Sequence, residues 1–213
     1  LFSVNEKTGD ARISGTLASL CGLETSIARG NSKDTVLAIQ RILLMQAHSF
    51  FVGGIPVIFY GDEAGYTNDY SYLQDESKNY DNRWMHRPVI DWEKNKKIDL
   101  AGTTEQIIFS STKKLIAIRK KLAVMADRKN LTWLTPHNIH VAGFLREWND
   151  ERVYCIFNFS SQEQHLTWYA FKENGINPST LYDHWAEKKY TVKEDNEYFT
   201  LPPCSFFILE PVK

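Results

Sequence analysis

The sequence predicts a two-part fold in which an α/β portion is followed by an all-β domain. The first observation is a short apolar run at residues 55–60 (IPVIFY) that does not alternate, which is typical of a strand buried on both faces of a parallel sheet. The second is the long polar loop at residues 61–88, since parallel α/β folds carry their chemistry in the loops after the strands. The third is a change beyond about Leu131 to short β-rich runs separated by turn residues.

The elements before the buried run are helical. Residues 13–23 predict a short helix or an irregular covering segment. Polar residues at 31–34 supply helix-start chemistry, and apolar residues then recur at helical spacing over residues 35–52. Gly53 and Gly54 end this helix directly before the run, so the pattern is a helix–strand unit.

A second long helix follows the polar loop. Thr103 or Thr104 can cap its first turn, and basic residues at 119–121 suit its last turns. Its predicted core face consists of Ile108, Leu115, Ile118 and Leu122.

The remaining sequence predicts a small antiparallel β-sandwich. Asn149–Asp150 lies between two β-rich runs and indicates a hairpin turn. The expected strands are 140–148, 152–159, 165–169, 190–192, 198–201 and 205–209.

A strand buried on both faces needs parallel neighbours, and the sequence offers no other strand of this kind. We therefore expect residues 1–126 to be the C-terminal portion of a (β/α)8 TIM barrel whose other strands lie upstream, and residues 127–213 to be the β-sandwich domain. The chain begins at Leu1 rather than Met, which fits a processed protein or a piece of a longer one.

Bulk properties exclude several classes of partner. A net charge of −1 over 213 residues gives no electrostatic reason to expect nucleic acid or a membrane surface as a partner. No apolar run approaches the ~20 residues that a membrane-spanning helix needs. The three cysteines have no metal-ligand spacing, and their odd number favours a reducing, cytoplasmic compartment. We predict neither a metal nor a cofactor.

Three motifs carry a family resemblance: residues 8–16 (TGDARISGT), residues 53–63 (GGIPVIFYGDE), and residues 74–75 (QD) together with 81–88 (DNRWMHRP). With them, the sequence resembles the C-terminal part of an α-amylase-family (family 13) glycoside hydrolase, and within that family most resembles amylosucrase. The resemblance runs through nearly the whole chain, although after about Val124 it is mostly one of pattern.

The resemblance implies a parent enzyme that cleaves sucrose by a retaining mechanism. In the family, the catalytic carboxylates lie on earlier strands, so we expect no catalytic residue here and a fragment that is inactive alone. Asp62 and Glu63 cannot replace them, because adjacent residues at a strand end point to opposite sides, whereas a retaining pair must flank one bond. We interpret them as loop anchors.

The substrate-binding candidates are Arg83, Arg12, Arg146 and Tyr80. The resemblance implies that Arg83 pairs with an upstream Asp at the base of a glucose pocket, and that Arg12 and Arg146 contact sugar beyond it. A planar guanidinium suits such a carboxylate pair. For Arg146 a surface position on a strand is an equal alternative. Tyr80, with Trp84 and Tyr72, could stack on a sugar ring.

Other interpretations remain open for the function. The chain could be a carbohydrate-binding or structural β-sandwich module without catalysis. It could also belong to another α-amylase-family enzyme, such as an α-glucosidase or a trehalose synthase. The resemblance covers transfer to a glucan acceptor and hydrolysis alike, and it leaves the oligomeric state open.

Overall fold

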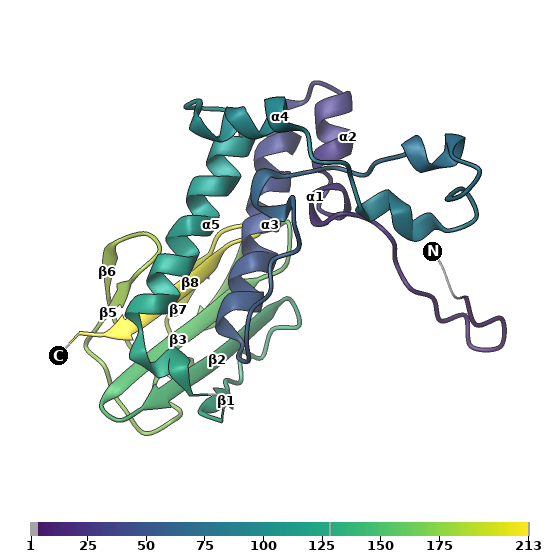
Figure 1. Cartoon of the computed structure of the whole chain (residues 1–213). Coiled ribbons are helices and arrows are strands. Elements are labelled where there is room, and N and C mark those ends of the chain that lie inside the picture. The colour runs from purple at the N-terminus through teal and green to yellow at the C-terminus, as the bar shows by residue number, and fades with distance from the viewer. Residues whose placement is uncertain (1–3, 128, 213) are drawn as a thin grey trace. The chain divides into compact units, whose positions relative to one another are not determined.

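The computed structural model describes residues 4–127 and 129–212, which divide into two compact units. The N-terminal unit comprises residues 4–42 and 58–110, and the C-terminal unit comprises residues 43–57, 111–127 and 129–212. The two longest helices, α3 (Ser32–Phe51) and α5 (Thr104–Lys121), contribute residues to both units (Figure 1).

The N-terminal unit is built from short helices with polar caps. The segment predicted as a short helix or a cover, residues 13–23, contains α1 (Leu17–Leu20). A second helix, α2 (Leu23–Ala28), begins at the last residue of that segment, after Gly22 at φ 94°. The carboxylate of Asp91 accepts the backbone N–H groups of residues 93 and 94 at 2.9 and 3.0 Å and so begins α4 (Trp92–Lys96). The 3-10 helices of this unit are Asp62–Ala64, Ser71–Gln74, Asn82–His86 and Lys97–Asp99.

Both long helices begin with the predicted chemistry. The Asn31 side-chain oxygen accepts the backbone N–H groups of Lys33 and Asp34 at 3.1 and 3.2 Å, at the start of α3. The Thr103 hydroxyl accepts the backbone N–H of Gln106 at 3.2 Å, at the start of α5. The predicted core face of the second helix is confirmed, because Ile108, Leu115, Ile118 and Leu122 are all buried.

The prediction of a buried strand at residues 55–60 is wrong for this chain. The segment forms no strand, and the side chains of Ile55 and Val57 are 83% and 82% exposed. No strand of the described residues pairs with it. The apolar side chains of Ile55 and Val57 are therefore not covered by another strand of the described residues. The TIM-barrel portion of the predicted fold remains a prediction.

The C-terminal unit contains two antiparallel sheets, in agreement with the predicted β-sandwich (Figure 1). The larger sheet has the strand order β1-β2-β3-β8-β5-β6, and the smaller pairs β4 with β7. The strands are β1 (Leu131–Trp133), β2 (Val141–Trp148), β3 (Glu151–Asn158), β4 (Gln164–Thr167), β5 (Thr180–Asp183), β6 (Lys188–Thr191), β7 (Tyr198–Leu201) and β8 (Phe206–Pro211). The 3-10 helices are Ala123–Ala126 and Trp168–Phe171.

The predicted hairpin turn joins the two longest strands. Trp148 pairs with Glu151, and Asn149 between them takes a positive φ of 53°, which an asparagine tolerates in a two-residue turn. This register places Leu145, Tyr154 and Ile156 on one face of the large sheet, where they pack with residues of the small sheet such as Leu166 in a single hydrophobic core. The sandwich is therefore closed by side chains from both sheets.

The opposite face of the large sheet packs against the end of α3. The His48 ring lies edge-on to the rings of Phe144 and Phe157, with centroids 6.3 and 5.2 Å apart. Burial lowers the pKa of His48, because it disfavours the imidazolium. His48 is thus a packing histidine, as its isolation from other metal-ligand residues in the sequence predicts.

Candidate functional site

The most organised polar group in the long loop is the pair formed by Arg83 and Asp81. Asp81 precedes the 3-10 helix Asn82–His86 and accepts the backbone N–H of Arg83 at 3.0 Å. The same carboxylate also binds the Arg83 side chain, with Nε at 2.8 and 2.9 Å from its two oxygens and Nη2 at 2.7 Å from Oδ2. These contacts fix the orientation of the guanidinium.

The pair leaves part of the guanidinium available. Hydrogen bonds from Arg83 lower the pKa of Asp81 to about 2, so this carboxylate is ionised at neutral pH. The Arg83 side chain is still 51% exposed, and its Nη1 makes no hydrogen bond to the described residues. A guanidinium offers five N–H donors. The donors at the open edge of Arg83 can therefore bind a second carboxylate or sugar hydroxyls.

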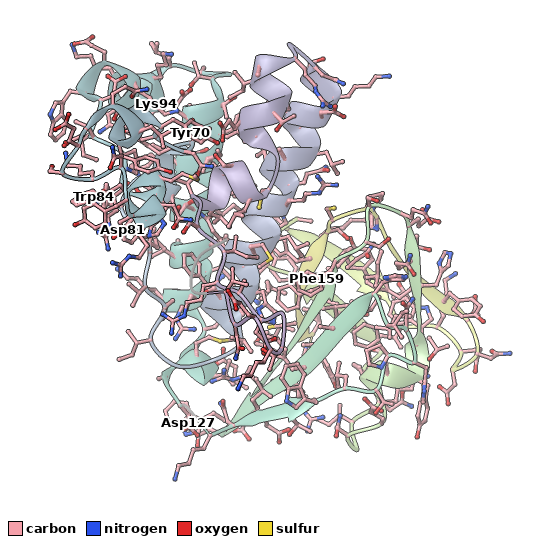
Figure 2. All side chains as sticks on the ribbon, turned by 90° about the vertical axis from the view of Figure 1, so that its right-hand side faces the viewer. Tyr70, Asp81, Trp84, Lys94, Asp127 and Phe159 are labelled. Atoms are coloured by element: carbon pink, nitrogen blue, oxygen red, sulfur yellow. The ribbon has the colours of Figure 1, made fainter. Side chains whose placement is uncertain are left out.

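The aromatic residues of this loop are placed differently from one another. Tyr80 is 82% exposed, so its ring is accessible to a ligand. Trp84 lies on the same loop as Asp81 (Figure 2) and is contacted by Lys78 Nζ and the Arg87 guanidinium carbon, each 5.2 Å from its ring centroid. Trp84 therefore packs within the loop through cation–π contacts.

The segment that carries Arg12 is attached to this loop. Ser14 Oγ donates to the Asn82 side-chain oxygen at 3.1 Å, and the backbone N–H of Thr16 donates to the Asn68 side-chain oxygen at 2.8 Å. Arg12 itself is exposed. The structure thus ties the first sequence motif to the third, the motif of Arg83, although the roles of Arg12, Tyr80 and Arg83 in sugar binding remain predictions.

Asp62 is the carboxyl group with the clearest raised pKa in this unit. Burial disfavours its ionised form and raises its pKa to about 6, with a smaller contribution from the neighbouring charge of Glu63. The backbone N–H of Leu17 donates to it and opposes the shift. This bond connects the loop that begins at Gly61 to α1, which supports the interpretation of Asp62 as an anchor.

The structure contradicts both interpretations of Arg146. The side chain is 0% exposed, so it is neither a surface residue of its strand nor able to contact a sugar in solvent. Its Nε donates to the Asn130 side-chain oxygen at 2.7 Å, and its Nη1 donates to the Phe51 carbonyl at 3.3 Å. Its Nη2 donates to the Asp127 carbonyl. Arg146 binds the protein's own backbone.

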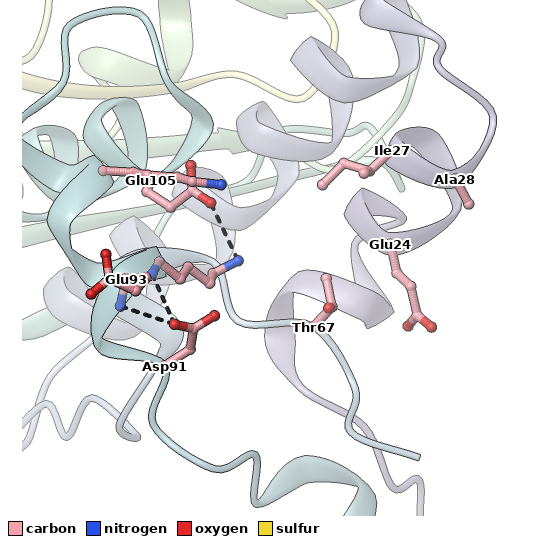
Figure 3. Close-up of a pocket in the computed structure, with 9 residues that line it drawn as sticks. Glu24, Ile27, Ala28, Thr67, Asp91, Glu93 and Glu105 are labelled. Atoms are coloured by element: carbon pink, nitrogen blue, oxygen red, sulfur yellow. Dashed lines mark hydrogen bonds and ion pairs between the residues drawn. The ribbon is translucent and has the colours of Figure 1, made fainter. Parts of the chain in front are cut away.

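A pocket of about 470 Å³ lies elsewhere in the N-terminal unit (Figure 3). Lys94 Nζ is 3.4 Å from a Glu105 oxygen and 5.1 Å from the Tyr66 ring centroid, and Asp91 is occupied in capping α4. Lys94, Glu105 and Asp91 therefore have internal partners. The lining residues are Glu24, Ile27, Ala28, Thr67, Asp91, Glu93, Lys94, Lys97 and Glu105.

Within residues 4–127 and 129–212 no group of three or more His, Cys, Asp or Glu side chains could hold a metal ion. The three cysteines are buried and form no disulfide among the described residues. A search of the described helices finds none with the length and hydropathy of a membrane span.

Comparison with known proteins finds a family match in the β-rich part of the chain. Residues 131–208 match the family described as the maltogenic amylase C-terminal domain. The match covers all but the last three residues of the eight strands, from β1 into β8.

The similarity extends beyond the maltogenic amylase C-terminal domain. The trehalose synthase of Thermus thermophilus is 23% identical over 196 residues, which cover 82% of this chain and 20% of that protein. The solved α-amylase of Geobacillus thermoleovorans with acarbose has a TM-score of 0.57 at 21% identity, covering 84% of this chain and 35% of its own.

An AmyP variant in complex with maltotriose has a TM-score of 0.66 at 14% identity, covering 87% of this chain and 37% of its own. At these identities the solved structures establish the fold. The chain therefore spans a fifth to about a third of the length of the proteins that it matches.

Sequence reasoning missed the partner of Arg83. Asp81 was recognised only as part of a motif, although an Asp two residues before an Arg at a helix start is a signal for a cap that also binds the side chain. The sequence places Arg119 only among the basic residues of the last turns of its helix, whereas its guanidinium donates to the backbone carbonyls of Phe50 and Gly54.

Proposed function

We propose that this chain is the C-terminal part of a retaining, sucrose-active enzyme of the amylosucrase type. Residues 1–126 would be the last portion of its (β/α)8 barrel, and residues 127–213 would form the C-terminal domain. The enzyme would transfer glucose from sucrose, releasing fructose, to a glucan, to fructose or to water. The similarity to α-amylase-family proteins over more than four-fifths of the chain supports the broad assignment.

The observation that carries the proposal is the geometry of Arg83. Asp81 holds one side of the guanidinium, and the exposed edge points its remaining donors away from that carboxylate. A carboxylate from the preceding part of the enzyme can then form the second, bidentate contact. Such a pair closes the base of a pocket to one sugar ring, which suits sucrose better than a long glucan.

The chemical step would belong to carboxylates outside these residues. A retaining glycosidase needs a nucleophile and a general acid/base whose carboxyl groups are about 5–5.5 Å apart. Asp62 accepts the backbone N–H of Leu17, and Asp81 is bound by Arg83. The residues described here would therefore bind and orient the glucosyl group without attacking it.

A second candidate is an enzyme that acts on maltose or trehalose. The trehalose synthase match covers 82% of the chain and supports this alternative directly. The C-terminal domain alone also supports a third candidate, a carbohydrate-binding or structural module. Carbohydrate is the proposed ligand in every case but the structural one.

The experiment compares substrates with the full-length enzyme. Fructose released from sucrose, with a glucosyl product or free glucose, supports the proposal. Conversion of maltose to trehalose or to glucose, with no fructose from sucrose, would replace it by the second candidate. Calorimetric titration of the 213-residue chain with sucrose and maltooligosaccharides tests the third, because micromolar binding would indicate a binding module.

A further inference from the structure

The C-terminal end of α3 is where the chain changes from helix to the exposed segment at residues 55–57. The last carbonyl groups of any helix lack intrahelical partners and need other donors. Here Phe51 ends the helix, and Gly53 and Gly54 follow with φ values of 136° and 69°. Something must therefore satisfy the carbonyls and hold the two glycines.

Two arginines supply the donors from separate elements of the C-terminal unit. Arg119, in the last turn of α5, donates to the carbonyls of Phe50 and Gly54, the latter at 2.9 Å. Arg146, in β2, donates to the carbonyl of Phe51 at 3.3 Å. Arg119 and Arg146, here called the arginine pair, thus bind two carbonyls of the last helical turn and the carbonyl of Gly54.

Arg146 is itself fixed in place. Its Nε donates to Asn130 at 2.7 Å and its Nη2 to the carbonyl of Asp127, and the side chain is fully buried. A buried guanidinium with three directed hydrogen bonds has little freedom to move. Arg146 thereby fixes the position of the helix end relative to the large sheet.

The charges of the arginine pair suit the helix end. Among residues 4–127 and 129–212, no carboxylate forms an ion pair with either guanidinium, and burial lowers the pKa of both. Two cations with only backbone and amide acceptors are favoured where the helix dipole presents its negative end. Their contacts are thus those of a helix cap.

Gly53 allows this contact. A Cβ on Gly53 would lie 3.1 Å from Nη1 of Arg146, and its φ of 136° is a conformation that other residues rarely adopt. The glycine therefore provides both the space for the guanidinium and the backbone turn.

We propose that Arg119 and Arg146 are positioning residues that hold the Gly53–Gly54 turn in one conformation, so that residues 55–57 leave the C-terminal unit in a fixed direction. Ile55 and Val57 are exposed and pair with no strand of the described residues, so they are then presented for pairing with a strand from the rest of the enzyme. Only this last consequence rests on the proposed function, in which these residues begin the barrel strand that precedes the Arg83 loop. The role replaces the predicted sugar contact of Arg146.

The test uses the 213-residue chain and two local measurements. Amide hydrogen exchange of Phe51 and Val52 reports the last turn of α3, and the heteronuclear ¹H–¹⁵N NOE of Gly53 and Gly54 reports the turn. Exchange of the β3 amides serves as the measure of global stability. None of these readouts requires sugar or catalysis.

Arg119→Gln removes both of its contacts, and we expect exchange at the helix end to rise about tenfold or more while exchange in β3 is unchanged. The glycine NOE values should fall. Arg119→Lys keeps the charge but cannot reach two carbonyls with a planar fork, so an intermediate effect is expected. Arg146→Gln should have the same effect as Arg119→Gln if the variant folds. If it does not fold, the Arg119 variants alone test the proposal, because Arg119 is partly exposed.

The matched control is Arg152→Gln. Arg152 is also a largely buried arginine of the large sheet, but it pairs with Glu147 and donates to the Asn174 carbonyl, away from α3. This control should leave the helix end unchanged. Unchanged exchange and NOE values in Arg119→Gln, or an equal rise in β3, would overturn the proposal. If the full-length enzyme released no fructose from sucrose, the proposed role of the arginine pair at the Gly53–Gly54 turn would still hold. Only the consequence for the barrel strand would be lost.

Discussion

Asn158 provides a sensitive test of the C-terminal domain, because one buried amide joins three segments. The side chain is 0% exposed, and its nitrogen donates to the carbonyls of Gln162, Leu201 and Pro202 at 2.9, 3.1 and 2.8 Å. Its oxygen accepts the backbone N–H of Ser160 at 2.9 Å. Asn158→Asp keeps the size and the acceptor but replaces the donor by a carboxylate that faces carbonyl oxygens.

The expected loss is large for an isosteric change. The two N–H donors that serve these three carbonyls disappear, and the buried carbonyl of Leu201 loses its donor at a cost of about 1–3 kcal/mol. An unpaired buried charge is also added, so we expect a loss of about 3–5 kcal/mol at pH 7. The introduced carboxyl should have a raised pKa in the folded state. The folded variant then binds more protons than the unfolded chain, and its deficit should shrink as the pH falls from 7 toward 4.

The assay is urea unfolding followed by tryptophan fluorescence, since Trp168 is buried in the same core. The control is Asn174→Asp, because the Asn174 side-chain nitrogen is buried with no hydrogen-bond partner in the described structure and the change removes no such bond. A midpoint for Asn158→Asp that matches the Asn174→Asp control, or a deficit that does not depend on pH, would refute the reasoning.

Three further predictions concern the stability and reactivity of buried sites. Asp62, with its pKa raised to about 6, contributes stability that is lost as the pH rises from about 4 to 6, so the stability of the wild type relative to Asp62→Asn should fall across this range in thermal unfolding at several pH values. Gly65→Ala should destabilise by about 1–3 kcal/mol more than Gly102→Ala, because both glycines have positive φ but only the Cβ at Gly65 would meet Ile108, at 2.6 Å. A chemical denaturation series comparing the two variants would contradict this if their losses were equal. The thiol of Cys155, fully buried with its pKa raised by burial, should resist an aromatic disulfide reagent at pH 8 until the chain unfolds, and rapid labelling of the native protein would contradict its placement.

The sequence predicted the sandwich well because its signals are local. The β-rich composition and the Asn149–Asp150 turn located β2 and β3 to within one residue. The sequence did not predict β1 and β5, which pair with the distant strands β2 and β8. Pairing of that kind leaves little trace in composition.

The failures at the site have a common physical origin. The apolar composition at residues 55–60 predicts that these side chains are buried. Burial also needs neighbouring strands, and no strand of the described residues pairs with this segment. Likewise, the sequence around Arg146 in β2 is the same whether the side chain faces solvent or a helix end. Only the tertiary contact with Phe51 shows that Arg146 is buried.

The central claim is that Arg83 closes a sugar pocket in a sucrose-using enzyme. The most direct measurement is the rate of fructose release from sucrose by the full-length enzyme carrying Arg83→Lys, compared with the same enzyme carrying Arg87→Lys. Arg87 lies on the same loop and packs on Trp84, a contact that lysine can also make. The account predicts that kcat/KM falls about 10- to 100-fold for Arg83→Lys, because lysine cannot form two bidentate contacts, and changes little for Arg87→Lys. Equal effects of the two substitutions, or an enzyme that releases no fructose but acts on maltose, would contradict it.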